Sequence, residues 1–189
     1  MKPTRTFIAI DPGQAIRDRL VSLQENLAKS GADVKWVEPK NLHLTLLFLG
    51  EVDQRDLVSV CRAVAETAAA RLAFPMTLEK TGAFPNTRRP KTLWVGVGQG
   101  AQEVCAVHDS IETPLLELGC YRREGRAYTP HLTLGRVRAD KSAESLTASL
   151  AKYADWRGGE TTVHEVLVMG SELNPDGPVY TVLGRGKLG

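Results

Sequence analysis

His43-Leu44-Thr45-Leu46 is repeated as His131-Leu132-Thr133-Leu134, 88 residues further along a chain of 189 residues. In an extended strand, side chains two residues apart point to one face and their neighbours point to the other. Each copy therefore presents an imidazole and a hydroxyl on one face, and two leucines suited to a core on the other. We predict two equivalent strands that bring two histidines and two threonines to a common cleft.

The hydrophobic pattern around these strands predicts a mixture of helices and strands. Each half of the chain carries two expected helices, several strands and one motif. We therefore expect one domain over residues 1–189 with an α+β fold: two pseudo-symmetric lobes, each an antiparallel sheet with helices on its outer face, the sheets facing a central cleft. The expected helices cover 14–29, a segment capped by Asp53, 101–118 and 142–153, and the expected strands cover 6–10, 34–37, 42–49, 74–80, 92–97, 131–137, 161–169 and 179–185, with a loop at 81–90.

Composition indicates a soluble globular protein, with 42% hydrophobic and 24% charged residues. The net charge of +2 is too small to indicate nucleic-acid binding by itself. Two basic stretches, Arg88–Lys91 and Arg122–Arg126, are either solvated loops or contacts to a phosphate backbone. The apolar run Phe7–Ile10 is too short for a signal peptide or a membrane span. Three cysteines without C-x-x-C spacing indicate reduced thiols, so we expect a cytoplasmic protein.

Two histidines suit acid–base chemistry near neutral pH, because one can accept a proton while the other donates one. Threonine hydroxyls can hydrogen-bond phosphoryl oxygens, and a strained 2′,3′-cyclic phosphate needs no metal to activate its leaving group. The His108-Asp109 dipeptide is expected on a solvated helix face, and His164 at or near the surface. Gly96–Ala101 matches G-x-G-x-x-A but lacks the following acidic strand, so we expect a simple turn. No metal or cofactor is expected, and neither a P-loop nor a K-x-D-G motif is present.

At these residues the chain resembles the 2H phosphoesterases, and within them the bacterial and archaeal RNA 2′,3′-cyclic phosphodiesterases, historically called 2′-5′ RNA ligases. The resemblance spans nearly the whole chain and departs at no motif position. The segments that carry it are Phe7–Ile10, Trp36–Gly50, Gly82–Pro85, Leu93–Val97, Thr129–Arg136, Ser171–Leu173 and Gly177–Tyr180.

The resemblance implies a role for each motif residue. His43 would protonate the ribose 3′-oxygen, His131 would take a proton from water, and Thr45 and Thr133 would hold the phosphate, giving a 2′-phosphate. Arg136 would bind phosphate, although strict alternation puts it on the opposite face from His131, so it would have to reach around the strand end. Phe48 has the same position after His43 and would either stack on a base or pack in the core.

The implied substrate is RNA with a 2′,3′-cyclic phosphate end, and ATP-independent 2′-5′ ligation would be a reverse-type activity. Two alternatives stay open: a phosphodiesterase for small cyclic phosphates, such as ADP-ribose derivatives, and a non-catalytic module that binds RNA ends. We expect a monomer with no membrane contact and no obligate protein partner.

Overall fold

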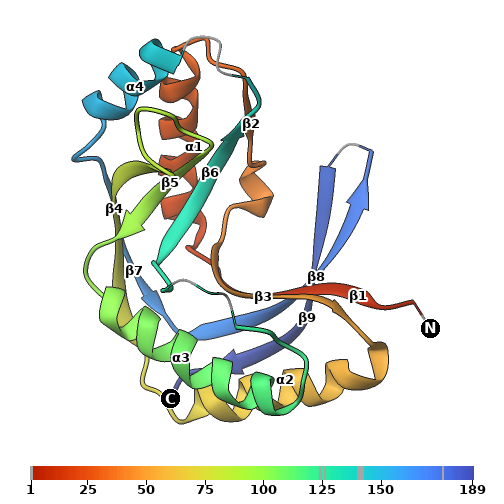
Figure 1. The fold of residues 1–189 in the computed structure, drawn as a ribbon. Coiled ribbons are helices and arrows are strands. Elements are labelled where there is room, and N and C mark those ends of the chain that lie inside the picture. The colour runs from red at the N-terminus through yellow and green to blue at the C-terminus, as the bar shows by residue number, and fades with distance from the viewer. Residues whose placement is uncertain (1, 124, 126, 140–142, 176) are drawn as a thin grey trace.

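A computed structural model of the chain describes residues 2–123, 125, 127–139, 143–175 and 177–189. Within them, nine strands and four α-helices form two lobes (Figure 1). The first lobe contains antiparallel neighbours in the order β3 (Leu44–Val52), β1 (Thr4–Ile10), β8 (Glu165–Asn174) and β9 (Gly177–Lys187). Helix α2 (Gln54–Ala69) packs across β9 and beside α3 (Ala101–Glu117).

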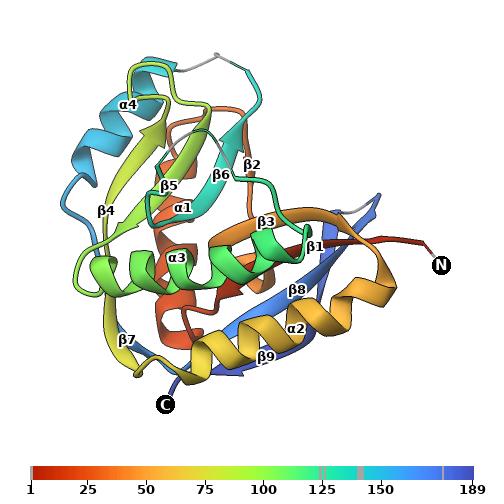
Figure 2. The ribbon, with the colours of Figure 1, turned by 60° about the horizontal axis from the view of Figure 1, so that its bottom comes forward.

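The second lobe is built on β6, which carries the second motif. Helix α1 packs against β7 and α4, on the far side of this lobe from α2 and α3 (Figures 1 and 2). A short 3-10 helix, Pro39–Asn41, leads from β2 into the first motif. The elements of this lobe are β6 (His131–Val137), β5 (Thr92–Val97), β4 (Phe74–Phe84), β7 (Arg157–Val163), β2 (Val34–Trp36), α1 (Gln14–Ala28) and α4 (Ala143–Lys152).

The two motif strands join the lobes into one curved sheet. β3 and β6 are antiparallel and pair at Leu44 and Leu132, which hold the same position in the two motifs. Two equivalent residues facing each other in an antiparallel pair mark a local two-fold axis. Both leucines are fully buried, so this axis passes through the core.

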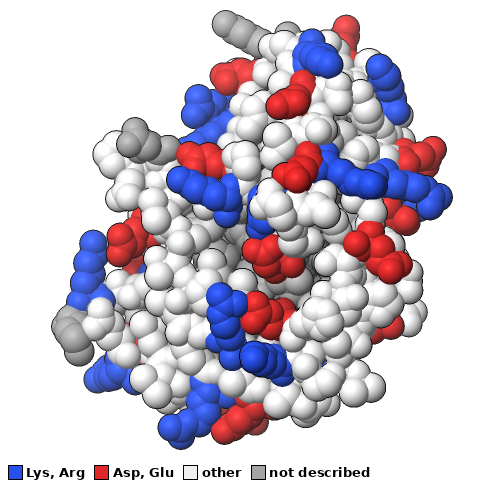
Figure 3. All heavy atoms as spheres, turned by 180° about the vertical axis from the view of Figure 1, so that it is seen from behind, with Lys and Arg blue, Asp and Glu red and all other residues white. Residues whose placement is uncertain are grey.

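The lobes are not the two halves of the chain. The first half supplies β1, β3 and α2 to one lobe and β2, β4, β5 and α1 to the other, and the second half is divided in the same way. Each lobe therefore depends on both halves for its core. On the face seen in Figure 3, basic and acidic side chains are interspersed, which agrees with the small net charge. Within the described ranges, no helix is long and apolar enough to cross a membrane.

Two expectations about the extent of the strands are wrong. The predicted loop at 81–90 begins late, because β4 continues to Phe84. Gly82 permits this, since a Cβ there would lie 2.2 Å from the Trp94 ring on β5. The single strand predicted over 161–169 is two strands, which belong to different lobes and meet at His164. Both segments are extended, so periodicity alone could not locate the crossing.

The other expected helices and strands are present, with ends shifted by a few residues. Leu146 and Leu150 of α4 are buried as predicted, whereas Ser142, the expected first residue of this helix, lies outside the described residues. Gly96–Ala101 forms the expected turn from β5 to α3, and Gly100 there adopts the left-handed conformation with φ of 83°.

Candidate active site

The four polar motif residues surround the local two-fold axis. Extending the antiparallel register from Leu44 and Leu132 by one residue in each direction sets His43 across from Thr133 and His131 across from Thr45. Directly opposed side chains in such a pair lie on the same face of the sheet. In this register two imidazoles and two hydroxyls share one face, with His43 directly before the first residue of β3, Leu44.

Both imidazole rings are held in the same way. Nδ1 of His43 lies 2.6 Å from the backbone oxygen of Asn41, and Nδ1 of His131 lies 2.7 Å from that of Thr129. A carbonyl oxygen only accepts hydrogen bonds, so Nδ1 carries the proton in each neutral ring. Proton exchange with a ligand therefore falls to Nε2 of each histidine.

Aromatic side chains support each ring. Phe7 stacks on His43 with ring centroids 4.8 Å apart, and Tyr180 meets the same ring edge-on at 5.3 Å. His131 has an edge contact with Phe84 at 4.9 Å and a looser one with Trp94 at 6.4 Å. These contacts, together with the Nδ1 hydrogen bonds, fix the direction in which each Nε2 points.

Burial lowers the pKa of His43 below its usual value of 6.5, outweighing the hydrogen bond to Asn41 and the charge of Asp11, both of which raise it. The free protein therefore holds His43 largely neutral at pH 7. An anion bound beside the ring would stabilise the imidazolium and raise this pKa again. The protonation of His43 is thus suited to coupling with phosphate binding.

An extra residue at the same position in each motif strand brings a further pair of side chains into the site. Leu46 has no partner on β1, and Leu134 has none on β5, so each forms a β-bulge. A bulge shifts the alternation by one residue. Phe48 and Arg136 therefore return to the cleft face. The expectation that Arg136 must reach around the strand end is wrong, and a core position for Phe48 is excluded because it is 55% exposed.

A side chain from elsewhere in the chain holds each bulge. The hydroxyl of Tyr128 donates to the carbonyl oxygen of Thr45 at 2.8 Å, directly before the first bulge. The buried amide of Gln24 on α1 donates to the carbonyl oxygens of Leu134 at 2.8 Å and Val37 at 2.9 Å, at the second bulge. Neither residue could be singled out from the sequence, since neither lies in a motif.

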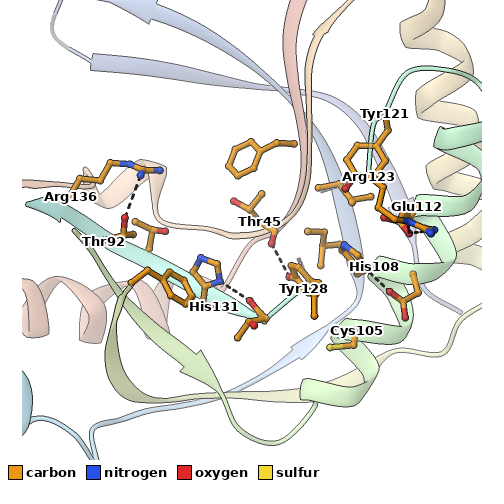
Figure 4. Close-up of a pocket in the computed structure, with 18 residues that line it drawn as sticks. Thr45, Thr92, Cys105, His108, Glu112, Tyr121, Arg123, Tyr128, His131 and Arg136 are labelled. Atoms are coloured by element: carbon orange, nitrogen blue, oxygen red, sulfur yellow. Dashed lines mark hydrogen bonds and ion pairs between the residues drawn. The ribbon is translucent and has the colours of Figure 1, made fainter. Parts of the chain in front are cut away.

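A cavity of about 610 Å³ opens beside the motif residues. Figure 4 shows Arg136 and Thr92 near one end and Glu112 and Arg123 near the other. His43 is not among the residues that line this cavity; its ring packs against Phe7 and Tyr180. The residues that the cavity shares with the predicted site are Thr45, Phe48, His131, Thr133 and Arg136.

His108 is not on a solvated helix face, contrary to the sequence expectation. It is 7% exposed and stacks on Tyr128, with ring centroids 4.1 Å apart and an interplanar angle of 8°. Its Nδ1 lies 2.8 Å from Oδ1 of Asp109, and both residues line the cavity. Tyr128 comes from the loop before β6, and its ring covers His108, so that the buried face of α3 is broader than its apolar residues alone. Helical periodicity could not indicate this contact.

The remaining candidates lie as follows. Arg123 donates from Nε and Nη2 to Oε2 of Glu112, at 3.0 and 2.7 Å, on the rim of the cavity. Glu124 and Arg126 of the same basic stretch lie outside the described residues. Arg88 is exposed and away from this cavity, and His164 is exposed as expected. In the described part of the chain, no three His, Cys, Asp or Glu side chains gather in a group that could hold a metal ion.

The three cysteines are free, as predicted. They are only partly buried, however, and Cys105 lines the cavity instead of facing the core. Burial raises the pKa of the Cys105 thiol, which keeps it protonated near neutral pH.

Comparison with known proteins places the whole site in a family. The model described as "LigT like Phosphoesterase" matches residues 10–94 and again 95–180, one match for each motif. Curated proteins named RNA 2′,3′-cyclic phosphodiesterase from Methanothermobacter thermautotrophicus and Archaeoglobus fulgidus are each 34% identical. Those alignments cover 94% and 93% of this chain, and 95% and 96% of the relatives.

Solved structures share the fold. TT0787 of Thermus thermophilus superposes with a TM-score of 0.79 at 28% identity, over 97% of both chains. E. coli LigT complexed with 3′-AMP shares the fold, with a TM-score of 0.77 over 98% of both chains. The chain therefore belongs to the LigT-like family of 2H phosphoesterases.

Proposed function

We propose that this protein hydrolyses RNA 2′,3′-cyclic phosphate ends to 2′-phosphates, with His43 as general acid and His131 as general base. The observation that carries the proposal is the matched pair of Nδ1 hydrogen bonds to backbone carbonyls on either side of the local two-fold axis. Each bond reserves Nε2 for proton transfer, and the opposed motifs suit attack and departure on opposite sides of phosphorus.

The reaction balances with these two groups alone. His131 Nε2 takes a proton from water as the water oxygen bonds to phosphorus in line with the departing 3′-oxygen. The bond from phosphorus to the 3′-oxygen breaks, and His43 Nε2 donates its proton to that oxygen. The phosphate stays on the 2′-oxygen, and a proton returned from His131 to His43 through solvent restores the free enzyme.

The other cleft residues act on the phosphate and the base. The hydroxyls of Thr45 and Thr133 donate to non-bridging phosphoryl oxygens, and Arg136 neutralises the charge that these oxygens carry. Phe48, exposed on the cleft face, offers a surface on which the terminal base can stack. The bound phosphate monoanion also raises the pKa of His43, so substrate binding supplies the acid that the reaction needs.

The relatives support RNA as the substrate, because curated proteins that this chain matches over nearly their whole length are named RNA 2′,3′-cyclic phosphodiesterase. Ligation of a cyclic end to a 5′-hydroxyl would use the same two groups, with the 5′-hydroxyl in place of water. His131 would take the proton of the 5′-hydroxyl as its oxygen bonds to phosphorus, and the 3′-oxygen would leave with a proton from His43, giving a 2′-5′ linkage.

The test is turnover of a 2′,3′-cyclic mononucleotide by the wild-type protein and by His43→Ala and His131→Ala. We expect release of a nucleoside phosphate by the wild type and a large loss in each variant. Binding of the nucleotide without turnover by the wild type would instead favour an RNA-end-binding module.

A further inference from the structure

A row of side chains next to His43 lies outside the cavity that holds the other motif residues. The strand register places Arg5 of β1 opposite Ser171 of β8, and Ser171 opposite Tyr180 of β9. Arg5 lies two residues before Phe7, so both point to the same face of β1. Phe7 and Tyr180 both contact the His43 ring, so this row begins where the proposed site ends.

This face of the sheet is open. Helix α2 covers the opposite face of β9, where a Cβ on Gly184 would lie 2.7 Å from the sulfur of Cys61. On the open face Val182 is 39% exposed and Phe48 is 55% exposed, while Tyr180 is half-buried. An exposed sheet surface with aromatic and apolar side chains is the kind on which unpaired bases stack.

The charge on this face favours a polyanion. Arg5 is exposed, and no ion pair joins it to another described residue, although Glu51 lies across from it on β3. Burial raises the pKa of Tyr180, while the charges of Arg5 and Arg136 both lower it, so both arginines lie close enough to act on this ring. Two cations near one aromatic side chain suit two successive phosphates of one strand.

We propose that the open face of β1, β8 and β9 binds the single-stranded RNA on the 5′ side of the cyclic end, with Arg5 contacting the first internucleotide phosphate. This inference rests on the proposed function and adds a direction to it. The cyclic phosphate lies at the two histidines beside Arg136, and the strand leaves past Tyr180 toward Arg5. The surface therefore favours oligonucleotides over small cyclic phosphates, which have no second phosphate to reach Arg5.

The test compares kcat/KM on a 2′,3′-cyclic mononucleotide with kcat/KM on a trinucleotide that ends in the same cyclic nucleotide. Arg5→Gln should lower the trinucleotide value about 3–10-fold relative to the mononucleotide value, and should reduce the salt dependence of trinucleotide binding by about 0.7 in log–log slope. The matched control is Arg62→Gln, which removes an exposed arginine from α2 behind the sheet and should leave the ratio unchanged.

An unchanged ratio in Arg5→Gln would overturn the inference, whether neither substrate is affected or both lose equally. Equal losses would mean that Arg5 only supports the His43 ring. A lowered ratio in Arg123→Gln in place of Arg5→Gln would show that the strand leaves along α3. Fluorescence anisotropy with a labelled trinucleotide ending in a 2′-phosphate reads the same surface without turnover. If Arg5→Gln binds this trinucleotide more weakly than the wild type, the RNA-binding role of the surface is supported. This holds even if the wild type fails to hydrolyse the cyclic end, a result that would refute only the proposed reaction.

Discussion

Replacing Gln24 with methionine should both destabilise the protein and weaken its hold on phosphate. Methionine keeps an unbranched side chain of similar length but cannot donate, so the hydrogen bonds to Leu134 and Val37 are lost together. A buried hydrogen bond contributes about 1 kcal/mol, and leaving a buried carbonyl unsatisfied costs about 1–3 kcal/mol more. Since Leu134 also accepts from the amide of Val37, only the carbonyl of Val37 is left without this donor, and we expect a total loss of about 3–5 kcal/mol.

The functional effect follows from the bulge. The extra residue Leu134 is what turns Arg136 to the cleft face, and Gln24 holds its carbonyl. If the bulge relaxes in Gln24→Met, Arg136 loses its place, and KM for a cyclic mononucleotide should rise with kcat affected less. Adding Gln24→Met to Arg136→Ala should then raise KM little further, because both changes remove the same contact.

Urea denaturation followed by circular dichroism gives the free energy of unfolding, and steady-state kinetics give KM and kcat. Gln14→Met is the matched control, since Gln14 is an exposed glutamine of the same helix and should change stability by less than about 0.5 kcal/mol. A stability loss in Gln24→Met no larger than in the control, or KM effects that add fully to those of Arg136→Ala, would refute the role given to this amide.

The motif residues themselves can be tested by substitution, chelation and titration. His43→Ala and His131→Ala should each lower kcat about 10²–10⁴-fold, and the double variant should have a kcat scarcely below that of the less active single variant. Thr45→Val and Thr133→Val should lower kcat by smaller factors. Near-normal turnover in either histidine variant would contradict the mechanism. Activity should persist in EDTA, because the proposed proton transfers use side chains alone; loss of turnover that a divalent ion restores would show otherwise. In an NMR titration the His43 imidazole should titrate below pH 6.5 in the free protein, since burial disfavours its charge, and at higher pH with a nucleoside 2′-phosphate bound; a midpoint at or above 6.5 in the free protein would count against this.

The motif strands could be predicted because their signals are local. A repeated tetrapeptide with leucines between polar residues fixes which side chains share a face, and the structure pairs the two copies at Leu44 and Leu132. The bulges could not be predicted in the same way. Each extra residue is a leucine like its neighbours, so nothing in its chemistry marks the change of register that brings Phe48 and Arg136 into the cleft.

Long-range contacts account for the other differences. His108 adjoins the apolar stripe of α3, and the ring of Tyr128, from a separate loop, stacks on it. The break at His164 marks a crossing between lobes inside a continuous extended segment. In the sequence Gln24 is one more polar residue of an amphipathic helix. Its role depends on the carbonyl of Leu134, which is 110 residues away in the chain.

The most direct test of the two-histidine account is phosphorus NMR of an oligonucleotide with a 2′,3′-cyclic phosphate end, followed with the wild-type protein in EDTA and with His131→Ala as control. If His43 protonates the 3′-oxygen while water activated by His131 attacks in line, the cyclic phosphate signal is replaced by that of a 2′-monophosphate, and the control shows almost no change in the same time. A 3′-monophosphate product would mean that the ribose lies the other way round in the cleft. Persistence of the cyclic signal with the wild-type protein would contradict the account as a whole.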